Sequence, residues 1–464
     1  MPVSSSIRIN ALLAAALVLL FSCFALAGDV VTYHNDNART GLYRDATLTT
    51  GNVNSGSFGL LYNTTVDGII DAQPLYLSSV PIPGQGTHNV VYVVTENDSV
   101  YALDADTGAT LWKVSLLGSG ETPSDDHGCT QISPQIGITS TPVIDRSSGP
   151  NGTIYVISMS KKSSSYFQRI HALDITTGAE QFSGPKTITA KYPGTGDNSQ
   201  NGFVVFDPAQ YAERAGLLLL NNVIYTAWTS HCDIRPYTGW IIAYDESTLA
   251  QTAVLNVTPN GNEGAIWQAG AGMAADANSI YFLQANGTFE TTLNAKGFPD
   301  LGDFGNAFMK IGLRNGKLRV LDYFNMFNTI QESNADQDLG SGGAMVLPPL
   351  KDSQGVMQLL AIGAGKDNNI YIVDRKNMGK FNPNNNDIYQ EIDGILAGGI
   401  WSMPAYFNQS VYFGAVGNNL MQFKFTNAKL STTPVSTTSN TFAYPGSTHA
   451  VSANGRTNGI VWAI

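Results

Sequence analysis

Hydrophobic and polar residues alternate along much of the chain, a pattern that predicts β-strands. In 90–114, VVYVVTENDSVYALDADTGATLWKV, apolar side chains recur at every second position in short runs. A period of two places them on one face of a strand. The Asp-Thr-Gly sequence predicts a turn, because the carboxylate of Asp104 can accept local amide hydrogen bonds and Gly108 can adopt a positive φ. The segment therefore reads as antiparallel strands joined by turns.

This unit repeats along the chain. It returns clearly in 153–182 and more loosely in 223–254, and each copy has a strand like VxYV followed by a second strand that ends in Asp. Weaker copies contain SIYFLQANG, LLAIGAGKDNNIYIVDR and SVYFGAVGNNLMQFKF. The ends of the second strands are marked by Asp104, Asp174, Asp245, Asp322 and Asp374. Repetition at such a period is typical of arrays and propellers.

The repeat predicts an all-β protein, a seven- or eight-bladed β-propeller of four-stranded antiparallel blades. A small sheet cannot bury both faces alone, whereas sheets stacked around an axis cover each other and leave few free edges. We expect one domain over 28–464, with six clear blades between about 60 and 437. The end, 446–464, resembles the first two strands of an incomplete last blade. Either the segment near 30–60 completes this blade, or the chain is truncated relative to its relatives. We favour truncation.

Composition supports this fold and excludes one class of partner. Charged residues make up 13% of the chain, about half the usual share, and the chain contains 47 glycines. The net charge is -11 and Lys and Arg do not cluster. We therefore expect no nucleic-acid partner.

The first residues are predicted to direct export. Residues 1–27 contain the apolar run INALLAAALVLLFSCFALA, which ends in Ala25-Leu26-Ala27. This pattern is typical of a signal peptide cleaved near Ala27. An anchoring helix is the alternative, but the chain turns polar at once. We predict a periplasmic or secreted protein with no membrane span after cleavage.

The unit VYVVTENDSVYALDADTGATLW resembles the repeat of pyrroloquinoline-quinone (PQQ) propellers, the quinoprotein alcohol dehydrogenase-like superfamily. The superfamily contains dehydrogenases and also cofactor-free members, among them an outer-membrane assembly lipoprotein. The resemblance covers nearly all of 28–464 and implies the fold more strongly than the activity.

Four positions match cofactor contacts of the dehydrogenases. By this resemblance, Trp267 in AIWQAG forms the floor under the quinone, and Asn286 in FLQANG is a calcium ligand. Asp338 in NADQDLGSGG is the catalytic base and a further metal ligand, and Lys366 in GAGKDNN contacts the quinone oxygens. These roles suit the chemistry, because an aromatic face holds a flat cofactor and oxygen ligands suit a hard cation. Each residue also has an ordinary interpretation, as a core Trp or as turn residues.

Other positions depart from the dehydrogenase pattern. Where a Glu ligand to calcium is expected, the chain has His231, a better ligand for transition metals. An expected Arg is replaced by Pro134, and an expected polar contact by Ile400. There is no Cys-x-x-Cys-His sequence, so we expect no covalently attached haem.

Two cysteines remain after signal cleavage, Cys129 and Cys232, each within two positions of a histidine. The alignment brings His127-Gly128-Cys129 and His231-Cys232-Asp233 toward the cofactor end of the channel. A disulfide between the two cysteines is favoured in an exported protein. A zinc or copper site using both histidines and both cysteines, or two free thiols, are the alternatives.

The sequence thus supports two functions. The first is a PQQ-dependent dehydrogenase that uses calcium and oxidises a small-molecule alcohol or a sugar hydroxyl. The second is a non-catalytic propeller, without cofactor, that binds an envelope protein or polymer.

Overall fold

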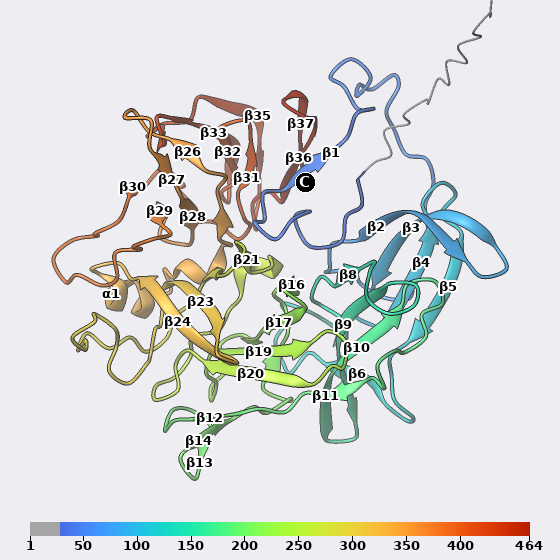
Figure 1. The fold of residues 1–464 in the computed structure, drawn as a ribbon, viewed down its shortest axis with the longest axis horizontal. Coiled ribbons are helices and arrows are strands. Elements are labelled where there is room, and N and C mark those ends of the chain that lie inside the picture. The colour runs from blue at the N-terminus through green and yellow to red at the C-terminus, as the bar shows by residue number, and fades with distance from the viewer. Residues whose placement is uncertain (1–27) are drawn as a thin grey trace, which may run out of the picture.

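The computed structural model describes residues 28–464, so the predicted signal peptide lies outside the described residues. The described residues form β-sheets almost throughout (Figure 1). Helical structure within 28–464 is confined to α1 (Thr329–Asn334), η1 (Gln268–Gly270) and η2 (Leu339–Ser341). No helix in this range is long and apolar enough to cross a membrane.

Six larger sheets follow one another along the chain and surround a common centre (Figure 1). The first sheet contains β2 (Leu75–Ile82), β3 (Gly86–Val94), β4 (Ser99–Asp104) and β5 (Thr110–Ser115). The second contains β6 (Thr122–Asp125), β7 (Gln135–Ile136), β8 (Val143–Asp145), β9 (Thr153–Lys162), β10 (Ser165–Asp174) and β11 (Lys186–Thr187). The third contains β16 (Leu218–Leu220), β17 (Val223–Ala227), β19 (Trp240–Asp245) and β20 (Gln251–Asn256).

The other three larger sheets follow the same plan. The fourth contains β21 (Ala274–Ala275), β22 (Ile280–Leu283), β23 (Phe308–Arg314) and β24 (Lys317–Phe324). The fifth contains β25 (Met345–Val346), β28 (Leu360–Ala364), β29 (Ile370–Asp374) and β30 (Gln390–Ile392). The sixth contains β31 (Ala405–Phe407), β32 (Ser410–Phe413), β33 (Asn418–Thr426), β34 (Lys429–Leu430) and β35 (Ser436–Phe442).

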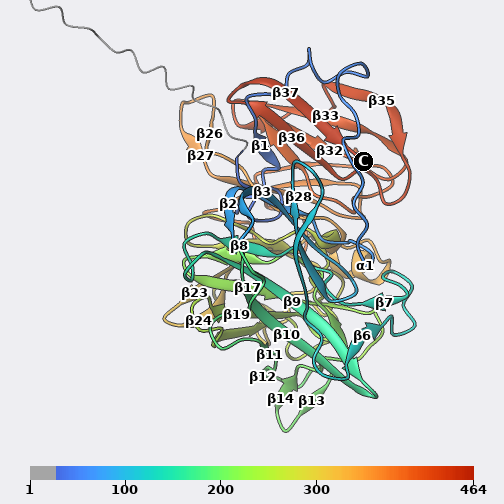
Figure 2. The same ribbon diagram turned by 90° about the vertical axis from the view of Figure 1, so that its right-hand side faces the viewer.

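Smaller sheets extend this frame. The excursion of β12 (Lys191–Pro193), β13 (Ser199–Gln200) and β14 (Phe203–Val205) protrudes from one end of the molecule (Figures 1 and 2). Two short pairs are β15 (Tyr211–Ala212) with β18 (Thr229–Ser230), and β26 (Leu350–Lys351) with β27 (Met357–Gln358).

The last sheet joins both ends of the described chain. It contains β1 (Leu42–Arg44), β36 (His449–Asn454) and β37 (Thr457–Ala463). β1 pairs in parallel with β36, so that Leu42 lies opposite Val451. The segment near 30–60 therefore contributes a strand to this sheet, whereas the sequence favoured the alternative of a truncated last blade.

Residues 30–44, which we call the central segment, make a hydrogen bond to each of these seven sheets. Its partners, in sheet order, are Tyr76, Ile144, Leu219, Ala275, Val346, Tyr406 and Val451. Arg39 of this segment is fully buried and donates to the carbonyl oxygens of Met273 and Leu217. The central segment thus connects sheets that are far apart in sequence.

The repeated turn forms as predicted. Asp104 Oδ1 accepts hydrogen bonds from the backbone N–H groups of Asp106 and Thr107, and Gly108 has a φ of 75°. The indole N–H of Trp112 donates to the carbonyl oxygen of Ile175 in the next repeat. The turn and the Trp are therefore parts of the frame.

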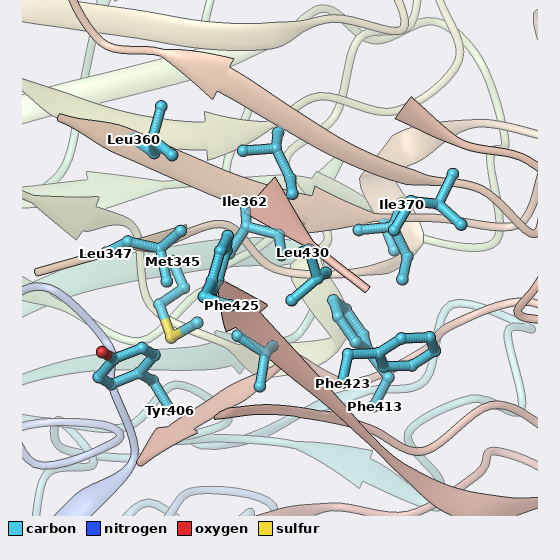
Figure 3. Close-up of a cluster of buried hydrophobic side chains, with 14 of the residues drawn as sticks. Met345, Leu347, Leu360, Ile362, Ile370, Tyr406, Phe413, Phe423, Phe425 and Leu430 are labelled. Atoms are coloured by element: carbon cyan, nitrogen blue, oxygen red, sulfur yellow. The ribbon is translucent and has the colours of Figure 1, made fainter. Parts of the chain in front are cut away.

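Apolar side chains fill the space between neighbouring sheets. Figure 3 shows the cluster between the fifth and sixth sheets, where Met345 and Ile362 meet Phe413, Phe423 and Phe425. Burial of such side chains supplies the main stabilising free energy of the sheets, about 25 cal/mol per Å² of apolar surface.

Candidate functional site

A cavity of about 560 Å³ brings together four of the residues singled out in the sequence. Trp267, Asn286, Asp338 and Lys366 all line it. The other lining residues are Thr130, Gln131, Arg214, Asp233, Ala269, Ala285, Ser341, Trp401, Tyr444, Pro445 and Thr448. We call this the main cavity. Residues 19 to 99 positions apart thus meet because successive sheets turn their connecting segments toward one place.

Lys366 is held between two carboxylates. Its Nζ lies 2.9 Å from Asp338 Oδ1 and 2.5 Å from Asp336 Oδ1. The backbone supports this contact, because Lys366 N–H donates to the carbonyl oxygen of Asp338. Burial alone would lower the pKa of Lys366, but the two carboxylates outweigh it and raise that pKa. Lys366 therefore carries its proton at neutral pH.

Asp338 is a buried carboxyl group at the cavity wall. It is 2% exposed and directly precedes η2. Burial raises the pKa of Asp338, and the neighbouring charge of Lys366 opposes this shift. A carboxylate with a raised pKa is a stronger base than an exposed one, which suits a group that accepts a proton from a substrate hydroxyl.

Asn286 follows β22 and shares a partner with Lys366. Its Nδ2 donates to Asp336 Oδ1 over 2.8 Å, whereas its Oδ1 is buried and has no hydrogen-bond partner. A buried amide oxygen without a partner is costly unless a ligand satisfies it. This oxygen and the Asp338 carboxylate are of the type that a hard cation prefers.

Trp267 offers an aromatic surface to the cavity. It is half-buried and immediately precedes η1. The guanidinium of Arg214 lies over its ring, with Cζ 5.3 Å from the ring centre. The positive charge of Arg214 is thus held against an aromatic face, a favourable arrangement.

His231, the third predicted metal ligand, does not line the main cavity. Its ring stacks on that of His127, with the ring centres 4.1 Å apart, and it is 5% exposed. Burial, aided by the charge of His127, lowers the pKa of His231 to about 3. Asp233, two positions later, lines the cavity instead.

The structure contains the predicted disulfide between Cys129 and Cys232, which are 103 positions apart. With both sulfurs bonded to each other, a metal site that uses both thiolates is not formed. Within 28–464, no group of three or more His, Cys, Asp or Glu side chains is placed to hold a metal ion. The disulfide instead joins two segments that supply Gln131 and Asp233 to the cavity wall.

Sequence reasoning missed several lining residues, above all Arg214 and Trp401. Arg214 follows β15 in the sequence YAERAG, where no motif marks it. Ile400 is buried in the apolar core, and the neighbouring Trp401 faces the cavity in its place. The pair Glu213-Arg214, placed just before the apolar run Leu217–Leu220, was the available signal for Arg214.

The fold is that of the quinoprotein alcohol dehydrogenases, which are β-propellers. A quinohemoprotein alcohol dehydrogenase from Pseudomonas putida HK5 superposes with a TM-score of 0.56 at 14% identity, over 94% of this chain and 61% of that one. The quinohemoprotein alcohol dehydrogenase from Comamonas testosteroni gives 0.55 at 16% identity, over 85% and 58%. A europium-containing methanol dehydrogenase gives 0.55 at 14% identity, over 87% and 72%.

This chain thus spans about three-fifths of the length of the first two enzymes. At these identities the likeness concerns the fold alone. Neither a protein-family model nor a curated protein matches the sequence.

Proposed function

We propose that the main cavity binds a flat quinone cofactor, and that the protein oxidises a hydroxyl group of an alcohol or a sugar. The observation that carries this proposal is the meeting of Trp267, Asn286, Asp338 and Lys366 in one cavity. These are the positions at which the sequence resembles the cofactor contacts of quinoprotein dehydrogenases. The fold of the structural neighbours supports the same assignment.

The residues of the cavity suit this chemistry. PQQ, when bound, supplies the electron acceptor of the reaction. Trp267 provides an aromatic face for a flat ring, and the protonated Lys366 provides a positive charge for quinone oxygens. Asp338 is the group that accepts the proton of the substrate hydroxyl. Trp401 contributes apolar surface that excludes water from the site.

A calcium ion would be held here by the unpartnered Oδ1 of Asn286 and the carboxylate of Asp338, both oxygen ligands of the type that calcium prefers. His231 does not join these two residues in the described geometry. We therefore assign the protein's contribution to a calcium site to Asn286 and Asp338.

We also propose a blade count and a location. The six larger sheets and the sheet of β1, β36 and β37 correspond to seven blades of one propeller over 28–464. Export to the periplasm or beyond, with residues 1–27 as signal peptide, follows from the sequence pattern and agrees with the disulfide.

A titration of residues 28–464 with PQQ and calcium, followed by tryptophan fluorescence, tests the proposal. We expect saturable quenching and dye-linked oxidation of members of an alcohol and sugar panel. Asp338→Asn should retain PQQ binding and lose oxidation, and Trp267→Ala should weaken binding. Lys376→Ala, an exposed change away from the cavity, is the matched control. The enzyme proposal fails if neither saturable binding nor oxidation occurs.

The second candidate function is a scaffold that binds an envelope protein. It is favoured by exposed apolar residues between β1 and β2, where Leu60 is 77% and Leu61 87% exposed. Apolar side chains gathered at a surface often mark a protein contact. This function would be supported if the wild-type protein binds no PQQ and if the double variant Leu60→Ser with Leu61→Ser no longer binds a protein that the wild type binds.

A further inference from the structure

The two cations that line the main cavity differ in their partners. Lys366 is paired with Asp336 and Asp338. Arg214 takes part in none of the ion pairs found within residues 28–464. The hydrogen bond of its side chain runs from Nη1 to Oε1 of Gln131, over 3.1 Å. The guanidinium thus retains most of its donors for another group.

The acidic groups around Arg214 do not neutralise it. Its neighbour Glu213 is buried and does not line the cavity, and burial raises the pKa of Glu213 to about 8. Burial and the neighbouring Asp71 raise the pKa of Glu96, and neither Glu96 nor Glu213 forms an ion pair with Arg214 within the described residues. Asp71 influences Arg214 only from beyond the 4.0 Å of an ion pair. A guanidinium keeps its proton at any ordinary pH.

Asp233 and Asp338, the two carboxyls that line the cavity, have other partners. Asp233 Oδ1 accepts a hydrogen bond of 2.7 Å from the hydroxyl of Tyr237, and Asp338 is paired with Lys366. A half-buried positive charge without a counterion is unfavourable unless a ligand supplies one. A guanidinium matches a carboxylate well, because two parallel N–H groups can donate to its two oxygens.

We propose that Arg214 binds a carboxylate carried by the substrate, so that the substrate is a hydroxy acid. This inference rests on the proposed function, because it places the reacting hydroxyl at Asp338 and the carboxylate at Arg214 in the same cavity. Trp267, Trp401 and Tyr444 offer aromatic surface to the body of such a substrate.

The test compares two ligands of nearly the same shape. Mandelate has an aromatic ring, a hydroxyl and a carboxylate, and mandelamide replaces the carboxylate by a neutral amide. Calorimetry on residues 28–464, without cofactor, should show mandelate binding about tenfold or more tightly than mandelamide. In Arg214→Gln this preference should fall to about twofold or less, and Lys376→Ala should keep it. Added salt should weaken the binding of mandelate only.

Each outcome bears on one of the two proposals. Equal binding of the two ligands to the wild-type protein overturns the hydroxy-acid inference, whether or not Arg214→Gln folds. A preference for mandelate that disappears once PQQ and calcium occupy the cavity assigns Arg214 to a carboxylate of the cofactor and overturns the inference. A loss of PQQ affinity in Arg214→Gln, without any preference for mandelate, does the same. The last outcome is a protein that prefers mandelate but neither binds PQQ nor oxidises any substrate. This result would support a carboxylate-binding site at Arg214 and reject the proposed function.

Discussion

The side chains of Lys366 and Asp338 depend on each other at the wall of the main cavity. Replacing Lys366 by Met leaves a buried carboxyl without its cation, which we expect to lower the free energy of unfolding by about 2–3 kcal/mol. The double variant Lys366→Met with Asp338→Leu should recover more than about 1 kcal/mol of this loss. Urea denaturation measures both values, with Lys376→Met as the control. Strictly additive effects of the two changes would contradict a coupled pair.

His231 makes stability depend on pH in the acid range. Burial and His127 hold the pKa of His231 near 3 in the folded state, whereas an unfolded His titrates near 6.5. Below 6.5 the unfolded chain therefore binds the proton first, and stability falls as the pH falls toward 3, by at most about 1.4 kcal/mol per pH unit. His127, Asp125 and Arg214 are the charged or titratable groups that act on this ring.

The comparison with His231→Gln isolates this contribution. The variant should show a flatter decline of unfolding free energy between pH 6.5 and 4 than the wild-type protein. His88→Gln is the control. Asp104 raises the pKa of His88, so His88 contributes to the unfolding free energy at low pH and loses this contribution as the pH rises, the opposite of His231. An unchanged acid slope in His231→Gln would show that other groups, such as the buried His34, cause the decline.

The site residues that could be predicted from the sequence are those that lie next to a recognisable copy of the repeated strand unit. Trp267 and Lys366 could be located because each has a fixed place relative to the strands of its unit. Arg214 lies where the unit is irregular, and its importance comes from the lack of a counterion, which is a property of three-dimensional neighbours. His231 does not line the main cavity, and its stacking on His127 is likewise a contact in three dimensions that no pattern of residues in the sequence indicates.

At the scale of elements, the disulfide links two connections that form the cavity wall. Cys129 precedes Gln131 and Cys232 precedes Asp233, so the bond holds two lining residues together. The closed loop of 103 positions constrains the unfolded chain, and the chain-entropy model gives about 4–5 kcal/mol for such a loop. We expect Cys129→Ser with Cys232→Ser to lose up to this amount, as measured by urea denaturation.

Reductant provides the control for this prediction. The wild-type protein in dithiothreitol should approach the stability of the double variant, whereas the variant itself should not respond. Alkylation of two thiols in the native, unreduced protein would show that the bond does not form.

Most strand positions could be predicted from the sequence, because they depend on local patterns of residues. β4 ends at Asp104 and β10 at Asp174, as the alternation and the Asp-turn signal predicted. The excursion of β12–β14 and the pair of β15 with β18 were not predicted, because they interrupt the repeat and are stabilised by contacts rather than by a pattern of their own.

At the scale of the whole molecule, the central segment provides a connection between sheets that are not neighbours and do not contact each other directly. Sheets in a ring touch only the next sheet on each side, so a segment bonded to all of them couples distant parts of the chain. No strand period marks residues 30–41, and this role could not be predicted from the sequence. A substitution of the buried Arg39 in this segment tests whether the segment couples the sheets.

Arg39→Met should destabilise the whole ring rather than one sheet. The change leaves the carbonyl oxygens of Met273 and Leu217 without their donor in a fully buried place, at a cost of about 3–5 kcal/mol. Hydrogen exchange should then rise in all the sheets to which the central segment is bonded. Arg44→Met, an exposed change at the end of the same segment, is the matched control and should leave exchange unchanged. Faster exchange confined to the third and fourth sheets, which Arg39 itself contacts, would show that the central segment acts locally and does not couple the ring.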